Sequence, residues 1–246
     1  MDETNQKQAV LPSLDHLTLA DFEHVYEPAE DTFLLCDSLE KDLETFRMSQ
    51  PERALEIGCG SGCVITFFGQ LTKRLGIKCR LFATDINAKA LDASRRTAEA
   101  NDVEISFSQV NLLGKYAPVD NSVDVLLFNP PYVPTPPEEV GGTSIEASWA
   151  GGLDGREVID RFLPILPQIL KKVTGVCYLV LVEENKPGEI QGIMREMNLT
   201  GEIFLRKKAR NEALQVMKIV WADLSEPKER EAGENSAVQR EQYISL

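Results

Sequence analysis

The sequence predicts one α/β domain with a mostly parallel, seven-stranded, Rossmann-like sheet that ends in an antiparallel hairpin. Three observations support this prediction. From about residue 52 onward, short runs typical of strands alternate with helical patterns, as they do in parallel sheets. The apolar run at 52–57 leads directly into a glycine-rich turn and a helix. The last two apolar runs are joined only by residues 206–212, which is too short for a crossover between parallel strands.

Each element is predicted from its apolar period and its flanking residues. Strands are expected over 52–57, 79–84, 103–109, 122–128, 175–182, 201–206 and 213–221. Helices are expected over 29–47, 62–75, 87–100, 155–172 and 186–198. They form one domain over residues 25–222, preceded by a flexible segment over 1–24 and followed by a disordered acidic tail over 223–246.

Composition excludes several classes of protein. Of the 246 residues, 43% are hydrophobic and 26% charged, which is typical of a globular protein with a substantial core. The longest apolar stretch, residues 176–182, is too short to cross a bilayer, and the N-terminal residues lack the pattern of a secretory signal. We therefore expect a soluble protein of the cytoplasm or nucleus, without a membrane partner.

The net charge of −13 is concentrated at the two ends of the chain. Residues 1–50 carry 12 acidic and 3 basic side chains, and residues 223–246 carry 6 acidic and 3 basic ones. The body between them is nearly neutral and has no basic stripe that would neutralise phosphates. Direct binding of nucleic acid is therefore not expected.

The cysteines and histidines do not form a metal-binding pattern. The five cysteines are scattered and include no Cys-x-x-Cys pair, and the two histidines, His16 and His24, both lie near the N-terminus. We expect neither a bound metal nor a disulfide framework.

The strongest local signal is the segment 55–62, with the sequence LEIGCGSG. Glycines at a strand-to-helix turn let a ligand approach the main chain beside the positive end of a helix dipole. The third glycine comes one residue too early for a dinucleotide fingerprint. Asp85 ends the following strand, where an acidic side chain can accept hydrogen bonds from both hydroxyls of a ribose. The alternative is that the glycines only shape a tight turn and Asp85 only caps a helix.

The second signal is Asn129-Pro130-Pro131-Tyr132, which follows the fourth strand where doubly wound sheets open their ligand crevice. Prolines lack a backbone N–H, so we expect the Pro130 carbonyl to face outward as a free acceptor beside the side-chain carbonyl of Asn129. Two acceptors next to an aromatic ring suit the binding of a planar, conjugated –NH₂ group. The alternative is a structural Asn-Pro turn with Tyr132 packed in the core.

Together these motifs resemble those of the HemK/PrmC-type glutamine N5-methyltransferases, in particular their eukaryotic branch. The resemblance runs from about residue 25 to 221 and rests on YEPAEDT at 26–32, EIGCGSG at 56–62, TDIN at 84–87, NPPYV at 129–133 and EASWAGG at 146–152. It implies the fold of the class I S-adenosylmethionine-dependent methyltransferases. It also implies methyl transfer to the glutamine amide of the Gly-Gly-Gln motif in the eukaryotic class-1 translation release factor.

The motifs and the resemblance together assign roles to individual residues. The residues expected to bind S-adenosylmethionine are Tyr26, Thr32, Glu56, Gly58, Gly60, Asp85, Asn111, Leu112 and Asn129. The expected catalytic residues are Asn129, Pro130 and Tyr132. The expected substrate-binding residues are Asn129, Pro130, Pro131, Tyr132 and Trp149, the last of them in a long Gly- and Pro-rich loop over 133–154. Asn111 stands where the family usually has an aspartate, so we expect weakened cofactor binding at that position.

The family also implies a heterodimer with a small zinc-binding activator subunit that pairs with the exposed edge of the sheet, here the strand near 103–107. The sequence leaves three alternatives to glutamine methylation open. Methylation of adenine N6 is disfavoured by the acidic balance and by the lack of a target-recognition domain. Lysine methylation needs a base that the sequence does not show. A non-catalytic scaffold is opposed by the intact site residues, with Asn111 the one departure in its favour.

Overall fold

The computed structural model of the chain describes residues 10–114, 121–142, 145–209 and 212–223. Seven strands form one sheet in the order β3-β2-β1-β4-β5-β7-β6, in which β7 is antiparallel to both of its neighbours and the other pairs are parallel. This confirms the predicted fold class. The strands are β1 (Arg53–Ile57), β2 (Arg80–Asp85), β3 (Ile105–Gln109), β4 (Val125–Phe128), β5 (Val176–Leu181), β6 (Leu199–Ala209) and β7 (Glu212–Trp221).

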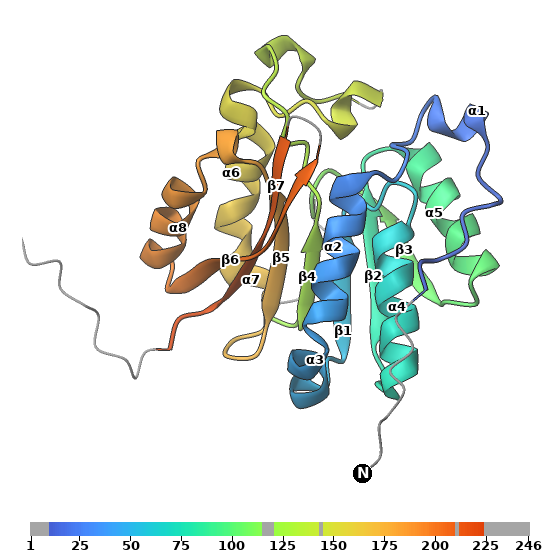
Figure 1. Cartoon of the computed structure of the whole chain (residues 1–246), viewed down its shortest axis with the longest axis horizontal. Coiled ribbons are helices and arrows are strands. Elements are labelled where there is room, and N and C mark those ends of the chain that lie inside the picture. The colour runs from blue at the N-terminus through green and yellow to red at the C-terminus, as the bar shows by residue number, and fades with distance from the viewer. Residues whose placement is uncertain (1–9, 115–120, 143–144, 210–211, 224–246) are drawn as a thin grey trace, which may run out of the picture.

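Helices flank the sheet along its whole width (Figure 1). Helices α4 and α5 lie with the β1–β3 half, and α6, α7 and α8 with the half that contains β5, β6 and β7. Helix α2 packs beside α4 and crosses toward β6 and β7. The helices are α1 (Leu19–Phe22), α2 (Glu30–Lys41), α3 (Leu43–Ser49), α4 (Cys63–Leu75), α5 (Ala88–Ala100), α6 (Glu157–Phe162), α7 (Leu166–Ile169) and α8 (Pro187–Glu196).

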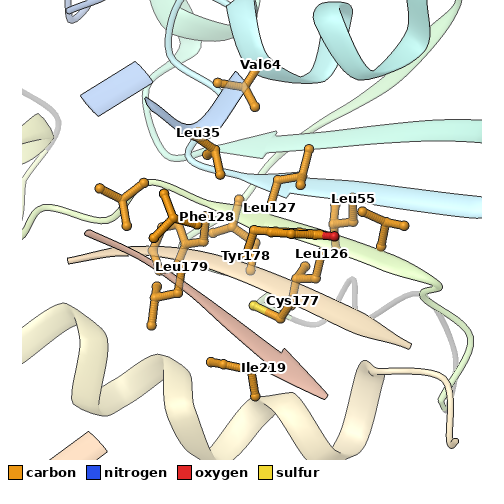
Figure 2. Packing of buried hydrophobic residues seen from close by; sticks show 14 of the residues in the cluster. Leu35, Leu55, Val64, Leu126, Leu127, Phe128, Cys177, Tyr178, Leu179 and Ile219 are labelled. Carbon is orange, nitrogen blue, oxygen red and sulfur yellow. The ribbon is translucent and has the colours of Figure 1, made fainter. Parts of the chain in front are cut away.

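The core is centred on β4, the middle strand of the sheet, and on its neighbour β5. Every residue of β4 and β5 is buried, so both faces of these strands are apolar, as expected for parallel strands covered by helices. Figure 2 shows Leu35 of α2 and Val64 of α4 packed together on one side of these strands. The carboxyl ends of β1, β2 and β4 are thereby held at one edge of a rigid layer, and the predicted site residues follow these ends.

The helix predicted over 29–47 is two helices, because the chain breaks at Asp42. Asp42 has φ −103° and ψ 25°, which is outside the helical region. Its buried carboxylate accepts a hydrogen bond from the Tyr178 hydroxyl at 2.5 Å and pairs with Lys218. These long-range partners outweigh the continuous helical pattern of the sequence.

The helix predicted over 155–172 is also wrong as a single element. The segment forms α6, a 3-10 turn and α7, with Pro164 and Pro167 each in the first turn of a new piece. Proline lacks the N–H that a continuous helix needs and clashes with the preceding turn.

The terminal hairpin is longer than predicted, since β6 and β7 extend to within two residues of each other. The expected connection, 206–212, is largely strand, and only residues 210–211 between the strands lie outside the described part. Strand β6 is an edge strand, and the side chains of Arg206, Lys207 and Lys208 are exposed on it. Charged side chains are common on edge strands. The polarity of residues 206–208 therefore did not indicate that the strand ends before them.

Residues 10–25 pack against helix α5. Ser13 and Asn101 exchange two hydrogen bonds of 2.8 and 2.9 Å between backbone and side chain, and His16 Nε2 lies 3.0 Å from Thr97 Oγ1. The described part of the predicted flexible segment therefore makes specific contacts, while its flexibility stays a prediction.

Residues 1–9 and 224–246 lie outside the described residues, and the prediction of a disordered tail concerns almost only these. In the part of the chain that the structure describes, no helix is both long and apolar enough to span a membrane.

Candidate active site

The glycine loop after β1 has backbone conformations that favour glycine. Gly58, Gly60 and Gly62 have φ values of 65°, 51° and 78°. The amide N–H of Gly60 donates to Asp85 Oδ2 at 3.0 Å, and the N–H of Asn87 donates to Asp85 Oδ1 at 2.8 Å. The carboxylate of Asp85 thus ties the end of β2 to the glycine loop.

Glu56 places a second carboxyl group below this loop. It is 2% exposed, and its Oε2 accepts the N–H of Ile65, one of the free donors in the first turn of α4. Burial raises the pKa of Glu56 well above its ordinary value, and burial also raises the pKa of Asp85. No cationic side chain among the described residues bonds to either carboxyl, so the buried Glu56 and the half-buried Asp85 suit a ligand that carries positive charge.

Asp31, near the start of α2, joins the N-terminal segment to the residues after β4. One of its oxygens, Oδ2, accepts from Asn129 Nδ2 at 2.9 Å and from the Tyr132 hydroxyl at 3.3 Å. The other, Oδ1, accepts from the backbone N–H of Thr32 at 2.7 Å and from the Tyr26 hydroxyl at 3.3 Å. Burial, and then the charge of Asp31, raises the pKa of both tyrosines, so both remain protonated donors.

This arrangement fixes the orientation of the Asn129 amide. Because Nδ2 faces the carboxylate of Asp31, the other end of the amide, Oδ1, is turned away from it. Asn129 Oδ1 is buried and has no hydrogen-bond partner among the described residues. A buried acceptor without a partner is costly, so this atom is suited to receive a donor from a ligand.

All nine residues predicted to bind the cofactor lie around one cavity. It is lined, among others, by Tyr26, Thr32, Glu56, Gly58, Gly60, Asp85, Asn111, Leu112 and Asn129. Pro131 also lines it, whereas the other predicted substrate residues, Pro130, Tyr132 and Trp149, are not among the described lining residues. Pro130 and Tyr132 are buried, and Trp149 is half-buried.

Comparison with known proteins identifies the family. A model of the family "Methyltransferase small domain" matches residues 32–140. The chain is 44% identical over 208 residues to Methyltransferase HEMK2 of Homo sapiens and of Mus musculus, which covers 84% of this chain and 94% of each relative. The chain belongs to the HEMK2 family of methyltransferases.

Two further relatives support the HEMK2 assignment. The chain is 39% identical over 227 residues to the eRF1 methyltransferase catalytic subunit mtq2 of Schizosaccharomyces pombe, with 85% of this chain and 94% of the relative covered. A solved structure of the E. cuniculi Mtq2-Trm112 complex matches with 29% identity and a TM-score of 0.59, covering 81% of this chain and 99% of that one. That complex is described as responsible for the methylation of the termination factor eRF1.

Sequence reasoning missed two residues of this HEMK2-family site. Asp31 lies within the motif at 26–32, but the sequence predicts no function for it. In the structure it accepts hydrogen bonds from both Asn129 and Tyr132. Asn185, which follows β5, donates to the carbonyl of Tyr132 at 2.8 Å. Only the pairing of β4 with β5 brings Asn185 to this position, so no local pattern could have found it.

Replacing Gly62 by alanine is expected to destabilise this HEMK2-family protein by about 2–5 kcal/mol, which is the sum of a left-handed residue and an overpacked contact. The added Cβ would overlap the Ser94 hydroxyl and lie 2.8 Å from Ser94 Cα. Gly60→Ala is the matched control, because φ is also positive there but nothing lies within 4 Å of the added Cβ. Urea unfolding without added ligand should show the larger loss for Gly62→Ala, and equal losses would contradict the steric explanation.

Proposed function

We propose that this protein transfers a methyl group from S-adenosylmethionine to the side-chain amide nitrogen of the glutamine in the Gly-Gly-Gln motif of eRF1. The observation that carries the proposal is the Asn129 amide, which is fixed by Asp31 and leaves Oδ1 as an unused acceptor at the wall of the cavity. The names of the S. pombe and E. cuniculi relatives support eRF1 as the substrate.

The residues around the cavity fit S-adenosylmethionine. Each oxygen of Asp85 accepts one backbone N–H and retains a lone pair for a ribose hydroxyl. The buried carboxyl of Glu56 suits the ammonium group of the methionine end, and the side-chain carbonyl of Asn111 suits the adenine amino group. When bound, the cofactor supplies an electrophilic sulfonium methyl group.

The acceptor nitrogen of glutamine is a weak nucleophile, since its lone pair is delocalised into the amide. Hydrogen bonds from its two N–H groups to Asn129 Oδ1 and to the Pro130 carbonyl would hold the –NH₂ group and favour a pyramidal nitrogen. In the proposed transfer an N–CH₃ bond would form as the cofactor's S–CH₃ bond breaks, the sulfonium would leave as a neutral thioether, and the proton lost from the nitrogen would pass to solvent. That proton becomes acidic only as the methyl group arrives, so no strong base is needed.

Binding of S-adenosylmethionine is expected to release protons and to strengthen as the pH rises. Because burial raises the pKa of Glu56, its carboxyl takes up a proton in the free enzyme at a higher pH than an exposed glutamate does. A cationic ligand favours the ionised form, so affinity falls as the pH drops below that raised pKa. Calorimetric titrations in two buffers of different ionisation enthalpy measure the number of protons released.

Glu56→Gln keeps the size of the side chain and removes its titration. We expect this variant to release fewer protons and to bind more weakly at high pH, with Asp85, whose pKa is also raised, accounting for the remainder. Equal proton release by the variant and the wild type would exclude Glu56 as the partner of the cationic group.

We further propose that the protein is the catalytic subunit of a heterodimer with a Trm112-type, zinc-binding activator. Strand β3 lies at one end of the sheet and pairs only with β2 in the described structure. Its residues Ile105 and Phe107 are half-buried, so a partner strand added at this edge would cover them. The Mtq2 relative of known structure is in complex with Trm112.

The test is transfer of a labelled methyl group from S-adenosylmethionine to purified eRF1, with the activator subunit present. Labelling is expected on wild-type eRF1 and is expected to disappear when the glutamine of the Gly-Gly-Gln motif is replaced by alanine. Labelling of adenine in nucleic acid or of a lysine instead would overturn the glutamine assignment. Failure of S-adenosylmethionine to stabilise the complex would overturn the cofactor assignment.

A further inference from the structure

Asn185 is an amide buried at the end of β5, next to the Asn-Pro-Pro-Tyr segment. It closes the 3-10 turn Glu183–Asn185, and it is 0% exposed while both glutamates of that turn are exposed. The proposed methyl transfer does not involve it directly. A buried asparagine must satisfy both ends of its amide, so its bonds define the surrounding backbone.

The side chain of Asn185 connects three backbone segments. Its Nδ2 donates to the carbonyl of Tyr132 at 2.8 Å and to the carbonyl of Asp154 at 3.0 Å. Its Oδ1 accepts the N–H of Val182, at the end of β5, at 2.8 Å. The carbonyl of Tyr132 is therefore held against a strand of the central sheet.

The turn at 152–155 closes on the same carbonyl from a second side. Gly155 has a φ of 66°, and a Cβ there would overlap the carbonyl oxygen of Tyr132 and lie 2.5 Å from Asn185 Nδ2. A Cβ at Gly151 would lie 2.8 Å from the carbonyl oxygen of Pro131. Backbone thus packs directly on backbone at this point, with no side chain between.

The two ends of Tyr132 are consequently held by different residues. Its hydroxyl donates to Asp31, and its carbonyl accepts from Asn185. Pro130 lies two positions and Asn129 three positions before Tyr132 in the chain, with only the conformationally restricted Pro131 between Pro130 and Tyr132. A shift of the Tyr132 carbonyl would therefore rotate the acceptor groups that precede it.

We propose that Asn185 is a positioning residue for methyl transfer, which sets the Asn129–Tyr132 backbone so that its acceptor groups meet the substrate amide. The inference rests on the proposed function for the identity of the acceptor. Asn185 acts from a site next to the catalytic segment and does not contact the substrate. Small displacements of reacting groups have large effects on rate, so a positioning residue acts on kcat.

The test compares Asn185→Leu with the wild type in the activator complex, because leucine keeps the approximate size of the side chain and neither donates nor accepts a hydrogen bond. We expect kcat for methylation of eRF1 to fall by about 10–100-fold, with the dissociation constant of S-adenosylmethionine within about twofold of wild type. Hydrogen exchange should become faster in peptides covering residues 129–135. Gln191→Leu is the matched control, because Gln191 Nε2 also donates to a backbone carbonyl, that of Gly201, at 2.8 Å.

Gly155→Ala perturbs the same carbonyl from the other side and keeps the test decisive if Asn185→Leu does not fold. It is expected to show the same loss of kcat with cofactor binding retained. An unchanged kcat in a folded variant would overturn the proposal. So would a parallel loss of cofactor binding and transfer, which indicates a general structural role. If the wild type does not transfer a methyl group to eRF1, the proposed function is wrong. The effect of the variants on kcat is then measured with the acceptor that the wild type does methylate.

Discussion

Replacing Asn129 by alanine is expected to lower the rate of methyl transfer by about 10²–10³-fold, the usual cost of removing one preorganised polar group that acts on the transition state. The amide is fixed at one end by a 2.9 Å hydrogen bond to Asp31, and its other end has no partner within the described structure. Its bond to the substrate is therefore prepared in advance and needs no reorganisation. Single-turnover rates with eRF1, at saturating S-adenosylmethionine, measure this effect without a contribution from product release.

Asn129→Asp separates the shape of the side chain from its chemistry. A carboxylate offers two acceptors to the substrate, but it would lie next to the carboxylate of Asp31 and has no N–H to donate to it. Repulsion between the two carboxylates would turn the new side chain away from the position in which the Asn129 amide meets the substrate. We expect this variant to be nearly as inactive as Asn129→Ala. If Asn129→Ala or Asn129→Asp keeps more than about a tenth of the wild-type rate, the proposed hydrogen bond from the substrate amide to Asn129 is contradicted.

The parts of this site that could be predicted from the sequence are residues that lie in short, continuous motifs. The glycine loop and Asp85 follow single strands, and Asn129 follows the fourth, so strand order alone brings them to one edge of the sheet. The roles assigned to these residues remain predictions, while their convergence on one cavity is a property of the fold.

The parts that could not be predicted depend on contacts between distant segments. Asp31 and Asn129 are 98 positions apart, and their bond requires α2 to reach the end of β4. Asn185 is 53 positions from Tyr132 and reaches it because β5 pairs with β4. The break at Asp42 has the same origin, since its partners Tyr178 and Lys218 lie on β5 and β7. Such contacts between buried polar groups form only when the folded chain brings distant segments together. The local periodicity of the sequence therefore does not predict them.

Asp31→Ala is expected to lower kcat by about 10–100-fold although Asp31 is not assigned a contact with the substrate. Without the carboxylate, nothing holds Nδ2 of Asn129, and the amide can present its –NH₂ group where the substrate needs an acceptor. Tyr132→Phe is the smaller matched change, because it removes only the 3.3 Å hydrogen bond to Asp31. We expect that variant to lose about 2–10-fold in kcat, the value of one net hydrogen bond.

A double-mutant cycle decides whether Asp31 acts through Asn129. If it does, Asp31→Ala has little further effect in a chain that already carries Asn129→Ala, because the group that it orients is gone. If the two losses multiply, Asp31 has a separate role, such as receiving the proton that leaves the acceptor nitrogen. The same cycle with Tyr26→Phe, whose hydroxyl bonds the other oxygen of Asp31, tests the link to the N-terminal segment. Coupling there would mean that the placement of Tyr26 at the cavity wall and the alignment of the Asn129 amide depend on one carboxylate.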